Sequence, residues 1–74
     1  MLKLSGREAE VYLLLLQGKT RKEIAKELFI ETTTVKSHMD RIYRKCNVHS
    51  LTELLIQRIK ELEQWINRAY IYNK

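Results

Sequence analysis

Ser37, His38 and Asp40 are residue types that serve in catalytic triads, and they stand close together in the chain. A triad needs its three side chains to line up as nucleophile, base and orienting group. The surrounding segment has helical spacing, and neighbouring side chains of one helix point in different directions. These residues therefore cannot form a triad. Because the chain also has no glycine-rich phosphate loop, the sequence indicates that the protein is not an enzyme.

The cysteine and the two histidines could in principle bind a metal ion. Cys46 and His49 are separated by two residues, and with His38 they could supply up to three zinc ligands. A structural zinc site normally has four ligands, and the chain has no other Cys or His. We instead expect His38 to be wedged between its helix and the backbone and His49 to be exposed. Neither a metal nor any other cofactor is predicted, and one cysteine excludes an internal disulfide.

Basic residues gather in the middle of the chain. The 74 residues include 14 Lys and Arg against 9 Asp and Glu, a net charge of +5, and residues 19–45 hold eight bases against four acids. This clustering is typical of a phosphate-binding surface, although a solvated basic face has the same composition. No apolar run reaches the roughly 18 residues of a membrane span. The charged start MLKLSGREAE does not resemble a signal peptide, so we expect a cytoplasmic protein.

Helix starts are marked three times by a hydroxyl residue followed three positions later by glutamate. In such a capping box the hydroxyl accepts from a backbone amide of the first turn, and the glutamate accepts from the amide of the cap residue. Gly18 and Asn47 are residue types that tolerate the left-handed conformation after a helix. The three pairs are Ser5 and Glu8, Thr20 and Glu23, and Ser50 and Glu53.

These signals predict an all-α chain that forms one domain over residues 1–74. The second and third helices are separated only by Phe29-Ile30-Glu31-Thr32, and so short a connection makes two helices cross steeply, as in a helix-turn-helix. The predicted helices are about 6–17, 21–28, 33–46 and 51–70.

The third predicted helix has two different faces. Thr32 or Thr33 is expected to cap it, and Thr34 to turn partly inward. Short polar residues here would let the helix N-terminus approach an anionic backbone, because its amides attract phosphate. The inward positions, at helical spacing, are Val35, Met39, Ile42 and Cys46. The outward positions are Thr33, Lys36, Ser37, Asp40, Arg41 and Arg44.

A set of residues matches a known signature, in order and without gaps, from residue 4 to about 55. The set is Leu4-Ser5, Arg7-Glu8, Glu10-Val11, Leu14-Leu15, Gly18, Lys22-Glu23-Ile24-Ala25, Leu28, Ile30, Thr34-Val35-Lys36, His38, Ile42, Lys45 and Val48. Through these residues the chain resembles the LuxR/GerE-type DNA-binding domain of bacterial transcription regulators. This resemblance implies a four-helix fold whose second and third helices form the helix-turn-helix. It also implies that the third helix enters the major groove of double-stranded DNA.

The resemblance also implies roles for individual residues. Base-facing positions are matched by Lys36, Ser37 and Asp40, and phosphate-holding positions by Thr20, Lys22, Thr33, Thr34 and Lys45. Three further residues lie on the outward face of the third predicted helix. Because of this position we predict that Thr33 also faces bases and that Arg41 and Arg44 also contact phosphates. Lys36 can donate to guanine O6 or N7, whereas contacts to the backbone set the register without selecting sequence. Alternatively, Lys36 forms an ion pair with Asp40.

Three residues depart from the family pattern. Glu31 stands where the family usually has a serine cap; a carboxylate there suits the helix dipole but repels phosphate. Asp40 could accept from cytosine N4, or pair with Lys36 or Arg44 and weaken direct readout. Cys46 replaces the usual leucine, so a slightly looser core is expected.

The last predicted helix is longer than the usual final helix of the family and has two apolar stripes. One stripe should cover Val11, Leu14 and Leu15, and the other should be available to a partner, unless both belong to the core. We predict a homodimer through this helix on a pseudo-palindromic site, with RNA polymerase as a further candidate partner. The alternative is a helical protein-interaction module that pairs without binding DNA. The predicted dimer seam is Leu55, Ile59, Leu62, Ile66 and Ala69, and the second stripe is Leu54, Trp65 and Tyr72.

Overall fold

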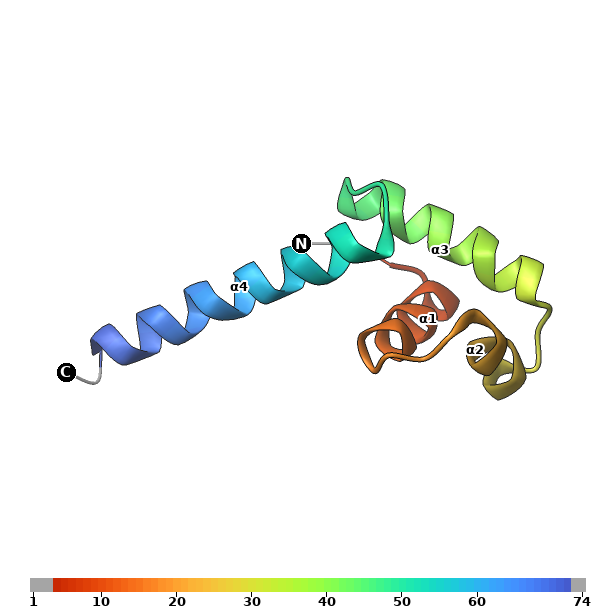
Figure 1. Ribbon diagram of the computed structural model, residues 1–74, viewed down its shortest axis with the longest axis horizontal. Helices are drawn as coiled ribbons and strands as arrows, with labels where there is room; N and C mark the ends of the chain where they lie inside the picture. The colour runs from red at the N-terminus through yellow and green to blue at the C-terminus, as the bar shows by residue number, and fades with distance from the viewer. Residues whose placement is uncertain (1–3, 73–74) are drawn as a thin grey trace.

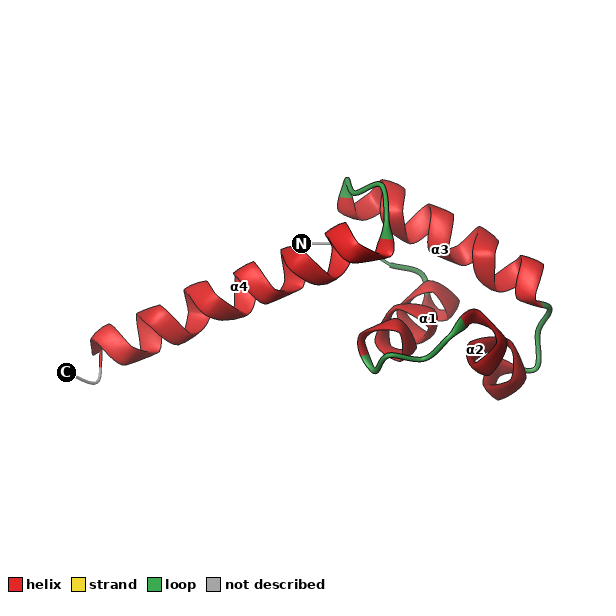
Figure 2. Cartoon of the chain, viewed as in Figure 1, coloured by secondary structure: helices red, strands yellow, loops and turns green. Residues whose placement is uncertain are grey.

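Four helices joined by short loops form the protein (Figure 1). The computed structural model describes residues 4–72, with side chains described as far as Ala69. Throughout the described residues the regular structure is helical, which confirms the all-α, four-helix architecture with an extended last helix (Figure 2). The helices are α1 Gly6–Leu16, α2 Arg21–Leu28, α3 Thr32–Cys46 and α4 Leu51–Tyr72.

Two of the three predicted capping boxes are complete. Ser5 Oγ accepts from the amide of Glu8 at 3.3 Å, and Glu8 Oε1 accepts from the amide of Ser5 at 2.9 Å. Thr20 and Glu23 make the same exchange at the start of α2, at 3.2 and 2.9 Å.

The third capping box, before α4, is only half formed. Ser50 Oγ accepts from the amide of Glu53 at 3.2 Å, as predicted. The carboxylate of Glu53, however, accepts from the amide of His49 instead of that of Ser50. The side chain has reached one residue further back, so the prediction was wrong for this half of the exchange.

The start of α3 differs from the prediction. The helix begins at Thr32, its N-cap residue is Glu31, and the Glu31 side chain makes no capping hydrogen bond. Neither Thr32 nor Thr33 is the cap, because both already lie inside the first turn. The reason lies in the preceding turn, which ends one residue earlier than expected and leaves Glu31 as the last extended residue.

The core lies where α3 crosses α1 and α2. Val35, Ile42 and Cys46 are buried on the inner face of α3, and Met39 packs partly buried beside them. This confirms the predicted inward face. The other buried apolar residues of the core are Val11 and Leu15 of α1, Ile24 and Ala25 of α2, and Leu54 of α4. Burial raises the pKa of the Cys46 thiol, which is therefore held in its protonated form.

Two non-glycine residues end helices in the left-handed conformation. Phe29 follows α2 with φ 56° and Asn47 follows α3 with φ 56°, while Gly18 after α1 has φ 83°. Phe29 turns the chain so that Leu28 and Ile30 on either side pack against the core, while its own ring stays 94% exposed. An aromatic residue is disfavoured here, because the left-handed conformation brings Cβ close to the backbone carbonyl.

We therefore expect Phe29→Asn to stabilise the protein by about 1 kcal/mol, because asparagine tolerates this conformation and an exposed ring contributes little packing. Urea unfolding followed by circular dichroism measures the change. Asn47→Ala is the matched control at the other left-handed position and should destabilise by a similar amount. If Phe29→Asn is destabilising, the ring has a packing role that its exposure conceals.

A buried carboxylate ties the start of α1 to the end of α3. Glu8 is 3% exposed, and its Oε1 lies 2.5 Å from Nζ of Lys45, 37 residues further along the chain. The hydrogen bond from Lys45, followed by that from the Ser5 amide, lowers the Glu8 pKa from 4.5 to about 2. The capping residue of α1 is thus also a tertiary contact.

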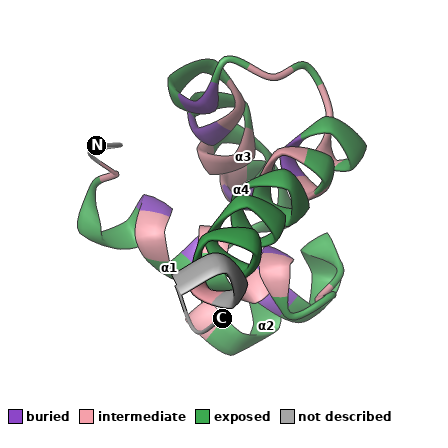
Figure 3. Cartoon of the chain, turned by 90° about the vertical axis from the view of Figure 1, so that its left-hand side faces the viewer, coloured by how far each residue is buried: buried purple, intermediate pink, exposed green. Residues whose placement is uncertain are grey.

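Only the first part of α4 belongs to the core. Leu54 is buried, and Gln57 Nε2 donates to the carbonyl oxygen of Cys46 at 3.1 Å, which fixes the direction in which α4 leaves α3. From there α4 projects away from the other helices, and residues 58–68 are all exposed (Figures 1 and 3).

The second predicted stripe of α4 is therefore not continuous. Leu54 lies in the core, whereas Trp65 is 68% exposed, because α1 ends before the core could follow α4 that far. Tyr72, the last member of the stripe, lies beyond the described side chains. The expectation that one whole stripe of α4 covers α1 was wrong.

Candidate nucleic-acid interface

The outer face of α3 carries polar and basic side chains that the core does not use. The structure leaves exposed all six residues that we placed on this face. Thr34 is half-buried, which confirms that it turns partly inward. The exposed residues are Thr33, Lys36, Ser37, Asp40, Arg41 and Arg44.

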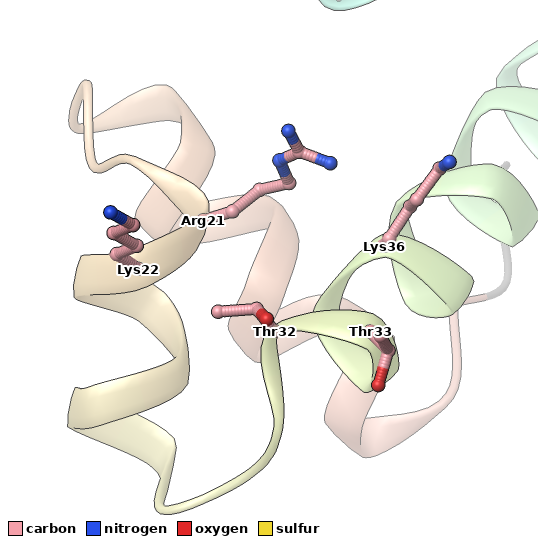
Figure 4. Close-up of a pocket in the computed structure, with 5 residues that line it drawn as sticks. All are labelled: Arg21, Lys22, Thr32, Thr33 and Lys36. Atoms are coloured by element: carbon pink, nitrogen blue, oxygen red, sulfur yellow. The ribbon is translucent and has the colours of Figure 1, made fainter.

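A cationic cleft of about 210 Å³ lies where the first turn of α2 meets the first turn of α3. Its walls bear three positive charges and two hydroxyl groups. In Figure 4 the charged ends of Arg21 and Lys36 project to the same side of the two helices, with Thr32 between α2 and α3. This volume is large enough to admit a phosphate group. The lining residues are Arg21, Lys22, Thr32, Thr33 and Lys36.

The first turn of α3 adds backbone donors beside this cleft. The first amides of a helix have no partner within the helix. At α1 and α2 the capping hydroxyl accepts from one of them, the amide of Glu8 or of Glu23, but Glu31 makes no such bond at α3. The amides of the first turn therefore keep the capacity to bind an anion, and the helix dipole favours negative charge at this end.

Two polar residues further along α3 have defined hydrogen-bonding capacity. Ser37 Oγ donates to the carbonyl oxygen of Thr33 at 3.2 Å, so its hydroxyl can still accept from a base amino group. Asp40 forms no ion pair with Lys36 or Arg44 in the part of the chain that the structure describes. Both Lys36 and Asp40 thus keep their charged groups available on the outer face.

Two predicted phosphate contacts already have structural partners. The hydroxyl of Thr20 accepts from the Glu23 amide, and its hydrogen can still be donated to a phosphate. Lys45 extends its ammonium group to Glu8, although the side chain stays 41% exposed. Lys22 is exposed and lines the cleft.

The two histidines lie apart from this interface chemistry. His49 is exposed, as expected. His38 is half-buried, and its Nδ1 is buried without a hydrogen-bond partner among the described residues. No group of three or more His, Cys, Asp or Glu that could hold a metal ion occurs in the described part of the chain. No helix in that part is long and apolar enough to cross a membrane.

Sequence reasoning missed two residues of the cleft. Arg21 was counted only as part of the basic segment, and Thr32 only as a possible cap. Arg21 occupies the first position of α2, directly after the cap Thr20. A basic residue at the N-terminal end of a helix is a signal that could have identified Arg21 as a possible phosphate contact. The place of Thr32 could not be inferred, because it depends on how the turn after α2 ends.

The residues predicted to form the dimer seam lie on the exposed side of α4. Leu55 is half-buried beside the core. Ile59, Leu62 and Ile66 are 53%, 46% and 57% exposed. Leu16 of α1 shares a hollow with Leu55, Ile59 and Leu62, but about half of each of the last two side chains and of Ile66 stays exposed to solvent as an apolar strip.

Comparison with known proteins gives a consistent family. Residues 2–57 match the family described as bacterial regulatory proteins, luxR family. The spore germination protein GerE of Bacillus subtilis is 44% identical over 62 residues, which cover 81% of this chain and 84% of the relative. The transcriptional regulatory protein LiaR of Bacillus subtilis is 43% identical over 53 residues, or 72% of this chain and 25% of LiaR.

The oxygen regulatory protein NreC of Staphylococcus carnosus extends the comparison to another organism. It is 40% identical over 58 residues, which cover 78% of this chain and 27% of NreC. The chain therefore spans most of GerE but only about a quarter of the larger regulators. The resemblance found in the sequence is confirmed: the chain belongs to the luxR family of bacterial regulatory proteins.

Proposed function

We propose that the protein binds double-stranded DNA sequence-specifically and regulates bacterial transcription, without enzymatic activity and in the cytoplasm. In this proposal residues 1–74 act as one DNA-binding domain. The observation that carries it is the cationic cleft at the shared N-terminal ends of α2 and α3, directly beside the exposed polar face of α3. Family membership supports the same function.

In the proposed complex α3 lies in the major groove, and its N-terminal half contacts base edges. Thr33, Lys36, Ser37 and Asp40 face the bases, with Lys36 donating to guanine and Asp40 accepting from cytosine N4. The cleft receives one phosphate, held by Arg21, Lys22 and the uncapped amides of α3. Further phosphate contacts come from Thr20, Thr34, Arg41, Arg44 and Lys45.

We also propose that two copies pair through the exposed strip of α4. A two-fold dimer presents α3 twice, so the half-sites should be inverted and about 10 base pairs apart, centre to centre. Support comes from the exposure of Ile59, Leu62 and Ile66, which a lone chain leaves in water. Selection of binding sites from a random DNA library would reveal both the preferred sequence and its symmetry.

Substitutions at Lys36 and Lys22 should distinguish recognition of bases from anchoring of the protein on the DNA backbone. We expect Lys36→Ala to cost about 1–3 kcal/mol on the preferred site and to relax base preference at one position, because its ammonium reaches a base. Lys22→Ala should weaken all DNA sequences similarly and reduce the salt slope by about one, because it neutralises a phosphate. Fluorescence anisotropy with selected and random duplexes over a range of salt concentrations measures both effects.

Lys60→Ala is the matched control, since Lys60 is exposed on α4, away from α2 and α3. It should leave DNA affinity nearly unchanged. Equal losses on selected and random DNA for both Lys36→Ala and Lys22→Ala would contradict the division of roles. A wild-type affinity that is weak and flat with salt would instead favour a protein-interaction module that pairs through α4 without DNA.

A further inference from the structure

Asp40 is an acidic residue on a face that otherwise carries basic and hydroxyl side chains. It is exposed on α3, with Lys36 one turn before it and Arg44 one turn after it. In the part of the chain that the structure describes, its carboxylate forms no ion pair with either of them. Burial, and then the charge of Asp40, raise the pKa of the neighbouring Tyr43. The helix therefore carries an unpaired negative charge at the place where the proposed complex brings in DNA.

A carboxylate at this place discriminates between the bases of the major groove. Guanine presents the acceptors N7 and O6 and thymine presents the acceptor O4, and a carboxylate is repelled by all three. Adenine presents its N6 amino group beside the acceptor N7, whereas cytosine presents its N4 amino group and no acceptor. Cytosine is thus the base that best satisfies Asp40.

We propose that Asp40 is a specificity-determining residue that disfavours every base except cytosine at the position it faces, and that it makes DNA binding sensitive to methylation of the cytosine N4 amino group. This role rests on the proposed function, in which α3 lies in the major groove. Without a hydrogen bond from a base, the carboxylate only repels the DNA phosphates. Lys36 and Arg44 reduce that repulsion, because both stand one helical turn from Asp40.

Methylation at N4 removes the hydrogen atom that Asp40 would use. The amino group of cytosine carries one hydrogen that pairs with guanine O6 and a second that points into the major groove. When base pairing is kept, a methyl group on N4 takes the place of the second hydrogen. The carboxylate then faces an apolar group instead of a donor. Methylation at C5, in contrast, leaves both hydrogens on N4.

The spacing along α3 indicates where this cytosine lies. Lys36 and Asp40 are four residues apart, or about 6 Å along the helix axis. Successive base pairs are about 3.4 Å apart. The cytosine should therefore lie about two base pairs from the guanine that Lys36 contacts.

Asp40→Ala tests the readout of cytosine. The variant should bind the selected duplex about tenfold more weakly, because a charge-assisted hydrogen bond to the base is lost. It should bind random duplexes about twofold more tightly, because a charge that repels phosphate is removed. Asp40→Asn should shift the preferred base from cytosine to adenine, since an amide can pair with N6 and N7. Fluorescence anisotropy on duplexes with each of the four bases at this position measures these changes.

Glu27→Ala is the matched control for net charge. Glu27 is an exposed acid of α2 that does not line the cationic cleft, and its loss changes the charge of the protein by the same amount. This variant should change the affinity for selected and random duplexes by the same factor. It should also keep the base preference of the unsubstituted protein.

Methylated duplexes test the regulatory property. The selected duplex is prepared with cytosine, N4-methylcytosine or 5-methylcytosine at the position where Asp40→Ala loses its preference. N4-methylation should weaken binding by the unsubstituted protein about tenfold, but binding by Asp40→Ala by less than about twofold. Methylation at C5 should change the affinity of the unsubstituted protein by less than about threefold, because the N4 donor stays in place.

The contrary results overturn separate parts of the proposal. If the selected site has another base at this position, or if Asp40→Ala loses no base preference, Asp40 does not read cytosine. If N4-methylation weakens Asp40→Ala as much as the unsubstituted protein, or if methylation at C5 is equally damaging, the N4 donor is not what Asp40 detects. An unsubstituted protein that prefers no DNA sequence would overturn the proposed function, and this role of Asp40 with it.

Discussion

The double variant I59E/L62E should be a monomer that keeps its fold and loses at least about 100-fold in affinity for a duplex with two half-sites. Four glutamates would meet in the seam of the proposed dimer, where burying unpaired charge is strongly unfavourable. Without pairing, the second half-site no longer binds at a high effective concentration, and that advantage is typically a factor of 10² to 10⁴. Sedimentation and fluorescence anisotropy measure the two effects.

The fold should survive because neither side chain contributes to the core. Ile59 and Leu62 are about half exposed, whereas the core contributed by α4 ends with Leu54. Circular dichroism should therefore show nearly unchanged helicity, and weak binding to a single half-site should persist. The matched control is Q64E/N67E, which adds the same charge to exposed positions of α4 outside the strip. Equal losses for the control would assign the effect to net charge instead of to the seam.

The second large effect concerns stability. Glu8→Gln should lower the melting temperature by about 10 °C near neutral pH, because the ammonium of Lys45 and the amide of Ser5 lose a charged acceptor at a buried position. Thermal unfolding followed by circular dichroism measures the change. Glu10→Gln is the control: it removes an exposed carboxylate of the same helix that pairs with Arg7 at 2.9 Å, and such pairs contribute little.

The effect of Glu8→Gln should depend on pH in a defined direction. Folding lowers the pKa of Glu8 from 4.5 to about 2, so the folded state favours the ionised carboxylate. This contribution is fully present above pH 4.5 and is lost as the pH falls towards 2. The difference in melting temperature between the two proteins should therefore shrink across that window. A constant difference from pH 7 down to pH 2 would show that packing, not charge, makes the contribution.

Local sequence signals predicted the helices well because they act over a few residues. The Ser5–Glu8 and Thr20–Glu23 exchanges need only the spacing of a single turn, and the structure contains both. The inward face of α3 followed from helical spacing in the same way, down to the burial of Val35 and Ile42. Hydrophobic periodicity on one helix needs no knowledge of the partner it packs against.

Features that depend on distant parts of the chain were not predictable. The sequence shows that Glu8 can cap α1, but not that Lys45 reaches it from 37 residues away. Phe29 gives no local warning of a left-handed conformation, and the packing of the flanking Leu28 and Ile30 against the core involves residues far along the chain. The change along α4 from buried Leu54 to exposed Ile59 depends on where α1 ends.

The two faces of α3 have a consequence for how such a domain can diversify. Lys36, Ser37 and Asp40 lie outside the core, whereas Val35 and Ile42 are fully buried within it. Exposed positions tolerate substitution with little change in stability, whereas buried ones do not. Mutations on the outer face can thus accumulate without unfolding the protein. In the proposed mode of DNA binding, one scaffold can acquire new operators through a few surface residues of a single helix, while selection on its interior stays unchanged.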